Sequence, residues 1–207
     1  MYKNITAIVL AGGKSSRMGE NKLFLQINGK TFVERILDLL NPLFPEVIFI
    51  SNRPEELEKF RVKVFRDIYP YYGPLAGIHS GLIHSNTEYN FVVSIDMPFI
   101  NSELIEHLLK NYKDSEITLP VADGQLQPLC GIYNKSVLPE IESLLKNVSF
   151  EGDKQKHKIN VRLFDLLNSV KINAVGITDK FFYNENIFMN INTLNDFEDA
   201  RKIFQKK

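Results

Sequence analysis

Short apolar runs alternate along the chain with longer amphipathic segments. The runs over residues 5–10 (ITAIVL), 47–51 (VIFIS) and 91–95 (FVVSI) are rich in β-branched residues and nearly continuous, which is typical of central strands covered on both faces. The segment from Thr31 instead repeats apolar residues at helical spacing. Thr31 and Glu34 can form a capping box at the start of this predicted helix. This alternation predicts an α/β fold: a single-domain, Rossmann-like three-layer sandwich with a mostly parallel sheet and helices on both faces.

The composition excludes several classes of protein. Lys and Arg together number 25, as do Asp and Glu, so the chain lacks the basic excess that nucleic-acid and membrane-surface proteins usually carry. No apolar run approaches the ~20 residues that span a bilayer, and the first ten residues predict a strand rather than a signal peptide. The single Cys130 permits no intramolecular disulfide. We expect a cytoplasmic protein that binds neither nucleic acid nor membrane.

Local patterns add further structural predictions. Asn28-Gly29 is a hairpin-turn dipeptide, Pro54 suits the first residue of a helix, and Asn101 is a good N-cap. By contrast, residues 127–133 (QPLCGIY) show no regular pattern. Further along the chain, we expect a strand that ends in residues 189–193 (MNINT).

The first apolar run leads into the sequence LAGGKSSRMGENK, residues 10–22. Gly12 and Gly13 let the backbone approach a ligand closely, and a glycine-rich turn can point successive N–H groups at phosphate oxygens. Arg17 and Lys22 add the positive charge that phosphate requires. The loop matches neither GxxxxGK[ST] nor GxGxxG, which disfavours a P-loop NTPase and a standard nicotinamide-binding fold. Taken alone, the glycines could equally serve a tight strand-to-helix turn.

Polar residues follow other predicted strands. Asn52, Asp67 and Asp96 each come directly after, or one residue beyond, such a strand. Ligands of open α/β sheets bind outside the carboxyl ends of the strands, so we expect these side chains to converge with the glycine loop on one crevice that binds a nucleoside triphosphate. That convergence from distant parts of the chain carries more weight than any one motif.

Asp96 and the GPLAG sequence (residues 73–77) each allow two interpretations. A carboxylate at the tip of a buried strand suits Mg²⁺ held jointly with phosphate oxygens; the alternative is a cap for the next helix, but Asn101 already fills that place. GPLAG offers a second loop for close approach to the nucleoside or the acceptor, and it also reads as a helix start with proline. Both roles are compatible.

Four motifs taken together, in this order, resemble the molybdenum cofactor guanylyltransferases: LAGGKSSRMGENK, GPLAG, DMPF and FMNINTLNDF. The resemblance spans about residues 5–200. The first motif is shared with the wider group of sugar-nucleotide and cytidylyl transferases, whereas GPLAG combined with NINT is narrower. LAGG favours guanine, since the related cytidylyltransferases tend to have LAAG. One departure is Asn21, where the family usually has Asp.

The resemblance implies one nucleotidyltransferase domain over residues 1–207, with a nucleotide-binding part at about 1–100 and an acceptor-binding part at about 101–207. It implies an enzyme that uses Mg²⁺ and transfers GMP from GTP to molybdenum-molybdopterin, forming the guanine dinucleotide cofactor and pyrophosphate. The implied roles are nucleotide binding by Leu10, Ala11, Gly12, Gly13, Lys22, Asn52, Asp67 and Asp96, catalysis by Arg17, Lys22 and Asp96, metal binding by Asp96, and acceptor binding by Gln127, Asn190 and Asn192.

Alternative functions stay open from the sequence. Another nucleotidyltransferase, such as a cytidylyltransferase acting on molybdopterin or on a sugar or polyol phosphate, would differ in nucleotide preference and acceptor. A non-catalytic nucleotide sensor on the same fold need not keep Arg17, Lys22 and Asp96. A Rossmann dehydrogenase is disfavoured by the missing GxGxxG. Because released cofactor is expected to be labile, direct handover to a molybdoenzyme or its chaperone is a further expectation, although no sequence patch identifies that partner.

Overall fold

The computed structural model describes residues 2–12, 22–151 and 163–205. The strands are β1 (Ile5–Leu10), β2 (Gln26–Ile27), β3 (Lys30–Thr31), β4 (Glu46–Ser51), β5 (Lys63–Arg66), β6 (Tyr89–Ser94), β7 (Ile117–Ala122), β8 (Gln125–Leu126), β9 (Cys130–Asn134) and β10 (Ile172–Gly176). The α-helices are α1 (Phe32–Leu40), α2 (Pro74–His84), α3 (Ser102–Asn111), α4 (Leu138–Glu151), α5 (Leu163–Leu167) and α6 (Leu194–Gln205). Short 3-10 helices are η2 (Lys22–Phe24), η3 (Pro54–Phe60) and η4 (Lys135–Val137).

The central sheet has the strand order β10-β7-β9-β6-β1-β4-β5, with β8 paired to β7. Neighbours pair in parallel except at β9, which is antiparallel to both β6 and β7, and at the short β8. The parallel strands therefore all end on the same edge of the sheet, as the crossover rule for successive β–α–β units requires. This edge, which we call the carboxyl edge, is where a ligand is expected in an open α/β sheet.

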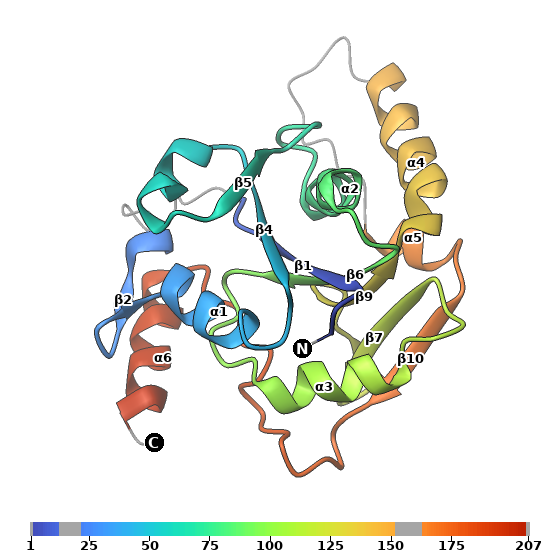
Figure 1. Cartoon of the computed structure of the whole chain (residues 1–207). Helices are drawn as coiled ribbons and strands as arrows, with labels where there is room; N and C mark the ends of the chain where they lie inside the picture. Colours follow the sequence, from blue (N-terminus) through green and yellow to red (C-terminus); the bar gives the residue numbers. More distant parts are fainter. Residues whose placement is uncertain (1, 13–21, 152–162, 206–207) are drawn as a thin grey trace.

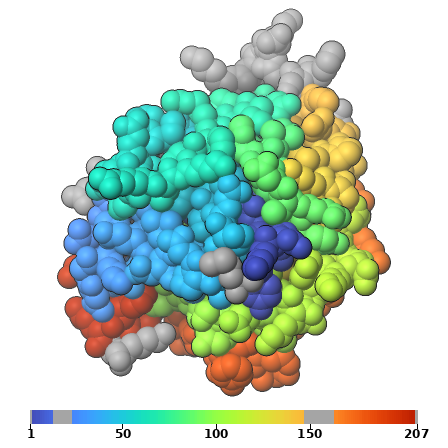
Figure 2. Space-filling model, viewed as in Figure 1, coloured from blue at the N-terminus to red at the C-terminus, as the bar shows by residue number. Residues whose placement is uncertain are grey.

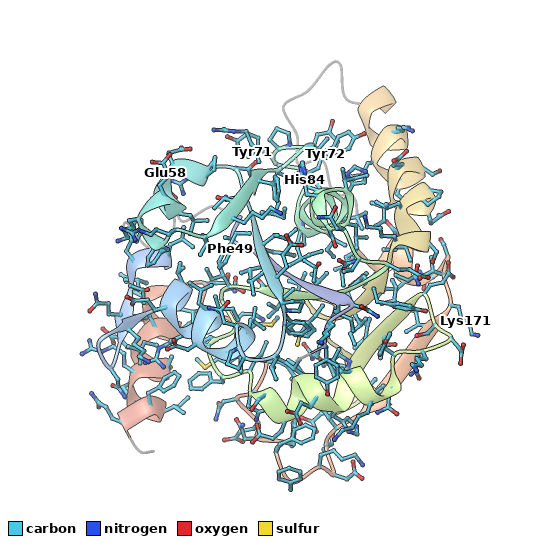
Figure 3. All side chains as sticks on the ribbon, in the orientation of Figure 1. Phe49, Glu58, Tyr71, Tyr72, His84 and Lys171 are labelled. Carbon is cyan, nitrogen blue, oxygen red and sulfur yellow. The ribbon has the colours of Figure 1, made fainter. Side chains whose placement is uncertain are left out.

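Helices cover both faces of the sheet and make three layers. Alternate residues of β1 show why: Ala7 and Val9 join the core that contains α1, α3 and α6, whereas Ile8 and Leu10 join the core beneath α2, α4 and α5. Figure 1 shows these two sets of helices on opposite sides of the strands, and Phe49 of β4, labelled in Figure 3, is completely buried in the first core. The predicted three-layer α/β sandwich is confirmed.

The C-terminal helix packs against early elements of the chain. The Asn28 side chain donates a hydrogen bond to the Phe204 carbonyl oxygen at 3.3 Å, and the Arg35 guanidinium lies 4.4 Å from the centre of the Phe204 ring. Phe32 at the start of α1 meets Phe197 of α6 edge to face. Figure 2 shows the consequence, with the red C-terminal part at lower left beside the lighter blue part of the chain.

Most local predictions are confirmed. Thr31 and Glu34 form the capping box at the start of α1, and the Asn101 side chain accepts from the third residue of α3 at 2.9 Å. Asn28 and Gly29 take positive φ angles of 49° and 75° in the β2–β3 turn. Pro54 begins a helix, but η3 has 3-10 and not α geometry. Within the described ranges, no helix combines the length and apolar character needed to cross a membrane.

Two segments differ from the sequence predictions. Part of the stretch that lacked a regular pattern forms β9, a fully buried strand in the middle of the sheet. Its apolar alternation is interrupted by Gly131, where an added Cβ would lie 2.7 Å from the Thr118 carbonyl oxygen, so only glycine fits without a shift. The predicted strand ending in residues 189–193 is wrong: this segment is an irregular connection that leads into α6, where Thr193 accepts a hydrogen bond from the Asp196 N–H.

Candidate active site

Backbone hydrogen bonds join the ends of three strands at the carboxyl edge. The Leu10 carbonyl oxygen accepts from the Ile95 N–H at 3.2 Å, and the Ala11 N–H donates to the Ile50 carbonyl oxygen at 2.9 Å. The end of β1 is therefore held between the ends of β4 and β6. Leu10 and Ala11, both predicted to line a nucleotide, lie at the centre of this edge.

Four predicted site residues follow four neighbouring strands of the sheet. The strands β6, β1, β4 and β5 are adjacent in that order and pair in parallel. Asp96, Gly12, Asn52 and Asp67 come one or two residues after the ends of these strands, in the same order. The chain segments that carry the four residues therefore lie side by side along the carboxyl edge.

Gly12 and Asn52 lie next to each other. A Cβ added at Gly12 would lie 3.8 Å from the Asn52 side-chain nitrogen, so the glycine leaves room above the strand end. The Asn52 side-chain oxygen is buried and has no hydrogen-bond partner among the described residues. The Asn52 main chain is held by Arg66, whose guanidinium donates to its carbonyl oxygen at 3.1 Å. An unpaired buried acceptor in a fixed loop suits a ligand that supplies a donor.

Asp67 is half-buried at the end of β5. Its Oδ1 accepts from the Ser80 hydroxyl of α2 at 3.0 Å and from the Tyr69 N–H at 3.1 Å. Burial raises the pKa of Asp67, while these two hydrogen bonds act in the opposite direction. The carboxyl group is therefore tied to α2 and to the loop that contains Tyr71 and Tyr72, at the top of the view in Figure 3.

Asp96 is the only buried carboxylate among the described residues, with 8% of its surface exposed. The Ser94 hydroxyl donates to its Oδ1 at 2.6 Å, and its carbonyl oxygen accepts from the Ile191 N–H at 2.9 Å. The described residues contain no cluster of three or more His, Cys, Asp or Glu that could hold a metal. A lone buried carboxylate does not suit a cage of protein ligands, but it fits a cation that completes its shell with phosphate oxygens and water.

The GPLAG segment forms the start of α2. Gly73 caps the helix with a φ of 86°, and Pro74 is its first residue, as one of the two interpretations predicts. Gly77 serves packing, since an added Cβ would lie 3.2 Å from the Leu10 side chain. Because α2 follows β5, its N-terminus and the positive end of its dipole lie at the carboxyl edge.

The predicted acceptor residues reach the same edge through loops. The Gln127 N–H donates to the Pro120 carbonyl oxygen of β7 at 3.1 Å, and two residues later the Leu129 carbonyl oxygen accepts from the Ser94 N–H at 2.9 Å. Asn190 and Asn192 flank Ile191, which is bound to Asp96. The chain segments that carry the three residues are therefore neighbours of the segment that carries Asp96.

Three predictions fall outside the described part of the chain. Gly13 and Arg17 lie within residues 13–21, and Lys22 begins η2 but its side chain is not among those described. Their roles remain predictions from the sequence.

The sequence analysis missed three side chains near the site. Ser94 precedes Asp96 by two residues in the SIDMPF sequence, and a hydroxyl so close in the chain to a predicted site carboxylate is a readable signal. Ser80 and His79 of α2 had no such signal: they reach Asp67 or its neighbours only through the packing of α2 on β5. His79 stacks edge to face on Tyr69, and burial lowers its pKa.

A cavity of about 220 Å³ lies between α1 and residues on both sides of Asp96. Apolar side chains of both segments line it, together with Lys30, Arg35 and Asp38. None of the predicted site residues lines it, so its size does not make it the candidate active site.

The chain is similar in sequence to known nucleotidyltransferases. The family model described as "MobA-like NTP transferase domain" matches residues 7–159. A relative from Clostridium perfringens (strain 13 / Type A), named "Probable molybdenum cofactor guanylyltransferase", is 42% identical over 199 residues, or 95% of this chain and 96% of the relative. A relative of the same name from Carboxydothermus hydrogenoformans is 32% identical over 209 residues, covering 99% of each chain.

A solved structure gives the same fold. Molybdopterin-guanine dinucleotide biosynthesis protein A from Archaeoglobus fulgidus matches with a TM-score of 0.78 at 24% identity, covering 98% of this chain and 100% of that chain. The matched family model covers the β1 end, Asn52, Asp67 and Asp96, and the full-length relatives extend the likeness through α6. The chain therefore belongs to the family of MobA-like NTP transferases.

Proposed function

We propose that the protein transfers GMP from GTP to molybdenum-molybdopterin, releasing pyrophosphate and forming the guanine dinucleotide form of the cofactor. The observation that carries the proposal is that the four neighbouring parallel strands β6, β1, β4 and β5 lead at their carboxyl ends into the segments of Asp96, Gly12, Asn52 and Asp67. The names of the full-length relatives support the acceptor, which the geometry alone does not specify.

The acceptors at the edge favour guanosine. Guanine offers a ring N–H beside an amino group, and its ribose offers hydroxyl donors. The Asn52 side-chain oxygen, which has no hydrogen-bond partner within residues 2–12, 22–151 and 163–205, and the half-buried Asp67 carboxyl group supply acceptors for such donors. Cytosine lacks a ring N–H donor, so the same acceptors would bind it with fewer hydrogen bonds. Leaving a buried acceptor unpaired costs about 1–3 kcal/mol, which is enough for discrimination between the two bases.

The transfer step needs positioning and charge neutralisation more than base catalysis. The terminal phosphate of the acceptor forms a bond to the α-phosphorus of GTP as the bond to the bridging oxygen breaks, and pyrophosphate leaves with that oxygen. Arg17 and Lys22 stabilise charge on the triphosphate. Asp96 would hold Mg²⁺, which when bound supplies further neutralisation of phosphate charge. Residues 10–13 line the nucleotide, and Gln127, Asn190 and Asn192 bind the acceptor.

The proposal divides the single domain by role. Residues of about 1–100 supply the nucleotide side, and residues of about 101–207 supply the acceptor side, with the link from Ile191 to Asp96 joining the two. The finished cofactor passes to a molybdoenzyme or its chaperone in the cytoplasm.

Equilibrium binding of GTP, CTP and ATP with Mg²⁺ tests the nucleotide half of this proposal. We expect GTP to bind most tightly, and Asp96→Ala to weaken that binding. Asp199→Ala, which removes an exposed carboxylate from α6, is the matched control and should leave it unchanged. A preference for CTP would replace guanylyl transfer by cytidylyl transfer, and absence of nucleotide binding would refute both.

A further inference from the structure

Ser94 and Asp96 form a short, buried hydrogen bond. Ser94 is the last residue of β6 and has 7% of its surface exposed, against 8% for Asp96. Its hydroxyl donates to Asp96 Oδ1 at 2.6 Å, the length expected of a charge-assisted O–H···O⁻ bond. At this length and burial, the hydroxyl restrains the rotation of the carboxylate group about its bond to Cβ.

The fold fixes the donor independently of the carboxylate. The Ser94 N–H donates to the Leu129 carbonyl oxygen at 2.9 Å, and the next residue, Ile95, donates to the Leu10 carbonyl oxygen at 3.2 Å. On the other side, the Asp96 carbonyl oxygen is held by the Ile191 N–H. Segments from three distant parts of the chain therefore immobilise residues 94–96, and the Ser94 hydroxyl completes this arrangement at the carboxylate.

We propose that Ser94 is a positioning residue that orients the Asp96 carboxylate for the divalent cation bound with the nucleotide; this rests on the function proposed above. Partners that orient a metal ligand typically change metal affinity by about 10- to 100-fold when they are removed. Without the hydroxyl, the carboxylate loses a hydrogen bond that restrains its rotation, and the cation must contribute more of its ordering on binding. The Ser94 side chain itself contacts Asp96, and the proposal gives it no contact with the substrate.

A purely structural role for Ser94 predicts something different. If the hydroxyl only satisfies a buried carboxylate, its loss lowers the stability of the fold and leaves cation binding by the folded protein unchanged. Metal affinity and stability must therefore be measured separately. Ser115 offers a matched control, because its hydroxyl is also buried and forms a 2.7 Å hydrogen bond to Thr118, on a strand other than β6.

The test is a titration of Mn²⁺ into the full chain in the presence of GTP, followed by electron paramagnetic resonance of the free ion. We expect Ser94→Ala to raise the dissociation constant of Mn²⁺ by about 10- to 100-fold, Ser94→Thr to restore wild-type affinity, and Ser115→Ala to leave it unchanged. Ser94→Cys, which keeps the shape but donates weakly, should weaken binding and serves if the alanine variant does not fold.

The outcomes separate this inference from the proposed function. Wild-type Mn²⁺ affinity in folded Ser94→Ala or Ser94→Cys would overturn the role of Ser94 while leaving guanylyl transfer intact. Failure of the wild-type protein itself to bind Mn²⁺ with GTP would overturn both.

Discussion

The N–H of Ile191 donates to the carbonyl oxygen of Asp96 at 2.9 Å. The bond joins the NINT sequence, far along the chain, to Asp96 in the turn that follows β6. Ile191 is completely buried, and the residues on either side of it, Asn190 and Asn192, are not. The segment that carries the two asparagines therefore lies beside the backbone of Asp96, and we propose that they bind the acceptor there.

Asn192→Ala is predicted to weaken binding of the acceptor and to leave GTP binding unchanged. A hydrogen bond to a charged group contributes about 1.5–3 kcal/mol, so we expect the KM for the acceptor to rise by roughly 10- to 100-fold. The measurement is steady-state kinetics with each substrate varied in turn. Asn195→Ala, which removes an exposed asparagine from α6, should have no effect. An equal rise in the dissociation constant of GTP would contradict a role on the acceptor side.

Asp96→Asn is predicted to lower the rate of pyrophosphate release by about 10²–10³, the scale seen when one preorganised charge stabiliser is removed. The substitution keeps the shape of the side chain and retains an oxygen that can accept from Ser94, so the fold should persist. Thermal unfolding of the variant checks this point. A variant that retains the wild-type rate at saturating Mg²⁺ would show that Asp96 is not the cation ligand.

Gly131→Ala is predicted to destabilise the fold by about 1–3 kcal/mol, the usual cost of overpacking. The added Cβ would lie 2.5 Å from the Leu119 side chain and 2.7 Å from the Thr118 carbonyl oxygen, and the backbone atom cannot move away without disturbing β7. At Gly176 nothing lies within 4 Å of an added Cβ, so Gly176→Ala is the matched control. Urea unfolding compares the stability of the two variants. Equal unfolding midpoints would show that the contact between β7 and β9 leaves room for a Cβ at residue 131.

The same glycine explains which parts of the fold could be predicted from the sequence. The strands β1, β4 and β6 were predictable because both of their faces are buried, which leaves a continuous apolar run. β9 is just as buried, but Gly131 interrupts its run to avoid Thr118, and a contact with another strand cannot be read from the residue itself. The prediction of a strand ending in residues 189–193 was wrong for a related reason. The backbone partner of this segment, the Asp96 carbonyl oxygen, lies far away in the sequence.

The positions of the candidate site residues could be predicted where they depend only on the ends of strands. Gly12, Asn52, Asp67 and Asp96 follow strands, and parallel pairing alone brings strand ends together. The contacts to Ser80 and His79 were not predictable, because they depend on how α2 lies on the sheet. That packing is set by Gly81, where an added Cβ would lie 2.4 Å from the Ile8 side chain.

His79 gives a prediction for the pH dependence of stability. Its ring is 4% exposed, and neither ring nitrogen has a hydrogen-bond partner among the described residues, since Glu142 Oε1 lies 3.7 Å from Nε2. Burial lowers the pKa of His79 below its ordinary value of 6.5. Below that value the unfolded chain binds a proton that the folded chain does not, so the free energy of unfolding falls as the pH drops from 6.5 towards the folded pKa.

His79→Leu is therefore predicted to reduce this loss of stability in acid. At pH 7 the variant should be as stable as wild type or more so, because apolar replacement of an unpaired buried group is nearly neutral or favourable. The pKa of His107 is also lowered, through burial first and nearby lysines second, so His107→Gln is the control that separates the two histidines. Urea unfolding at several pH values between 5 and 7 makes the comparison. An identical slope in wild type and His79→Leu would assign the pH dependence to other groups.

The most direct test of the central claim is the transfer reaction itself. The purified full chain is incubated with GTP, Mg²⁺ and molybdenum-molybdopterin, and the products are identified by mass spectrometry with pyrophosphate measured in parallel. If the protein is a guanylyltransferase, the guanine dinucleotide forms together with one pyrophosphate per dinucleotide molecule. No dinucleotide and no pyrophosphate form when CTP replaces GTP. Formation of the cytosine dinucleotide instead, or tight GTP binding without any product, would contradict the account.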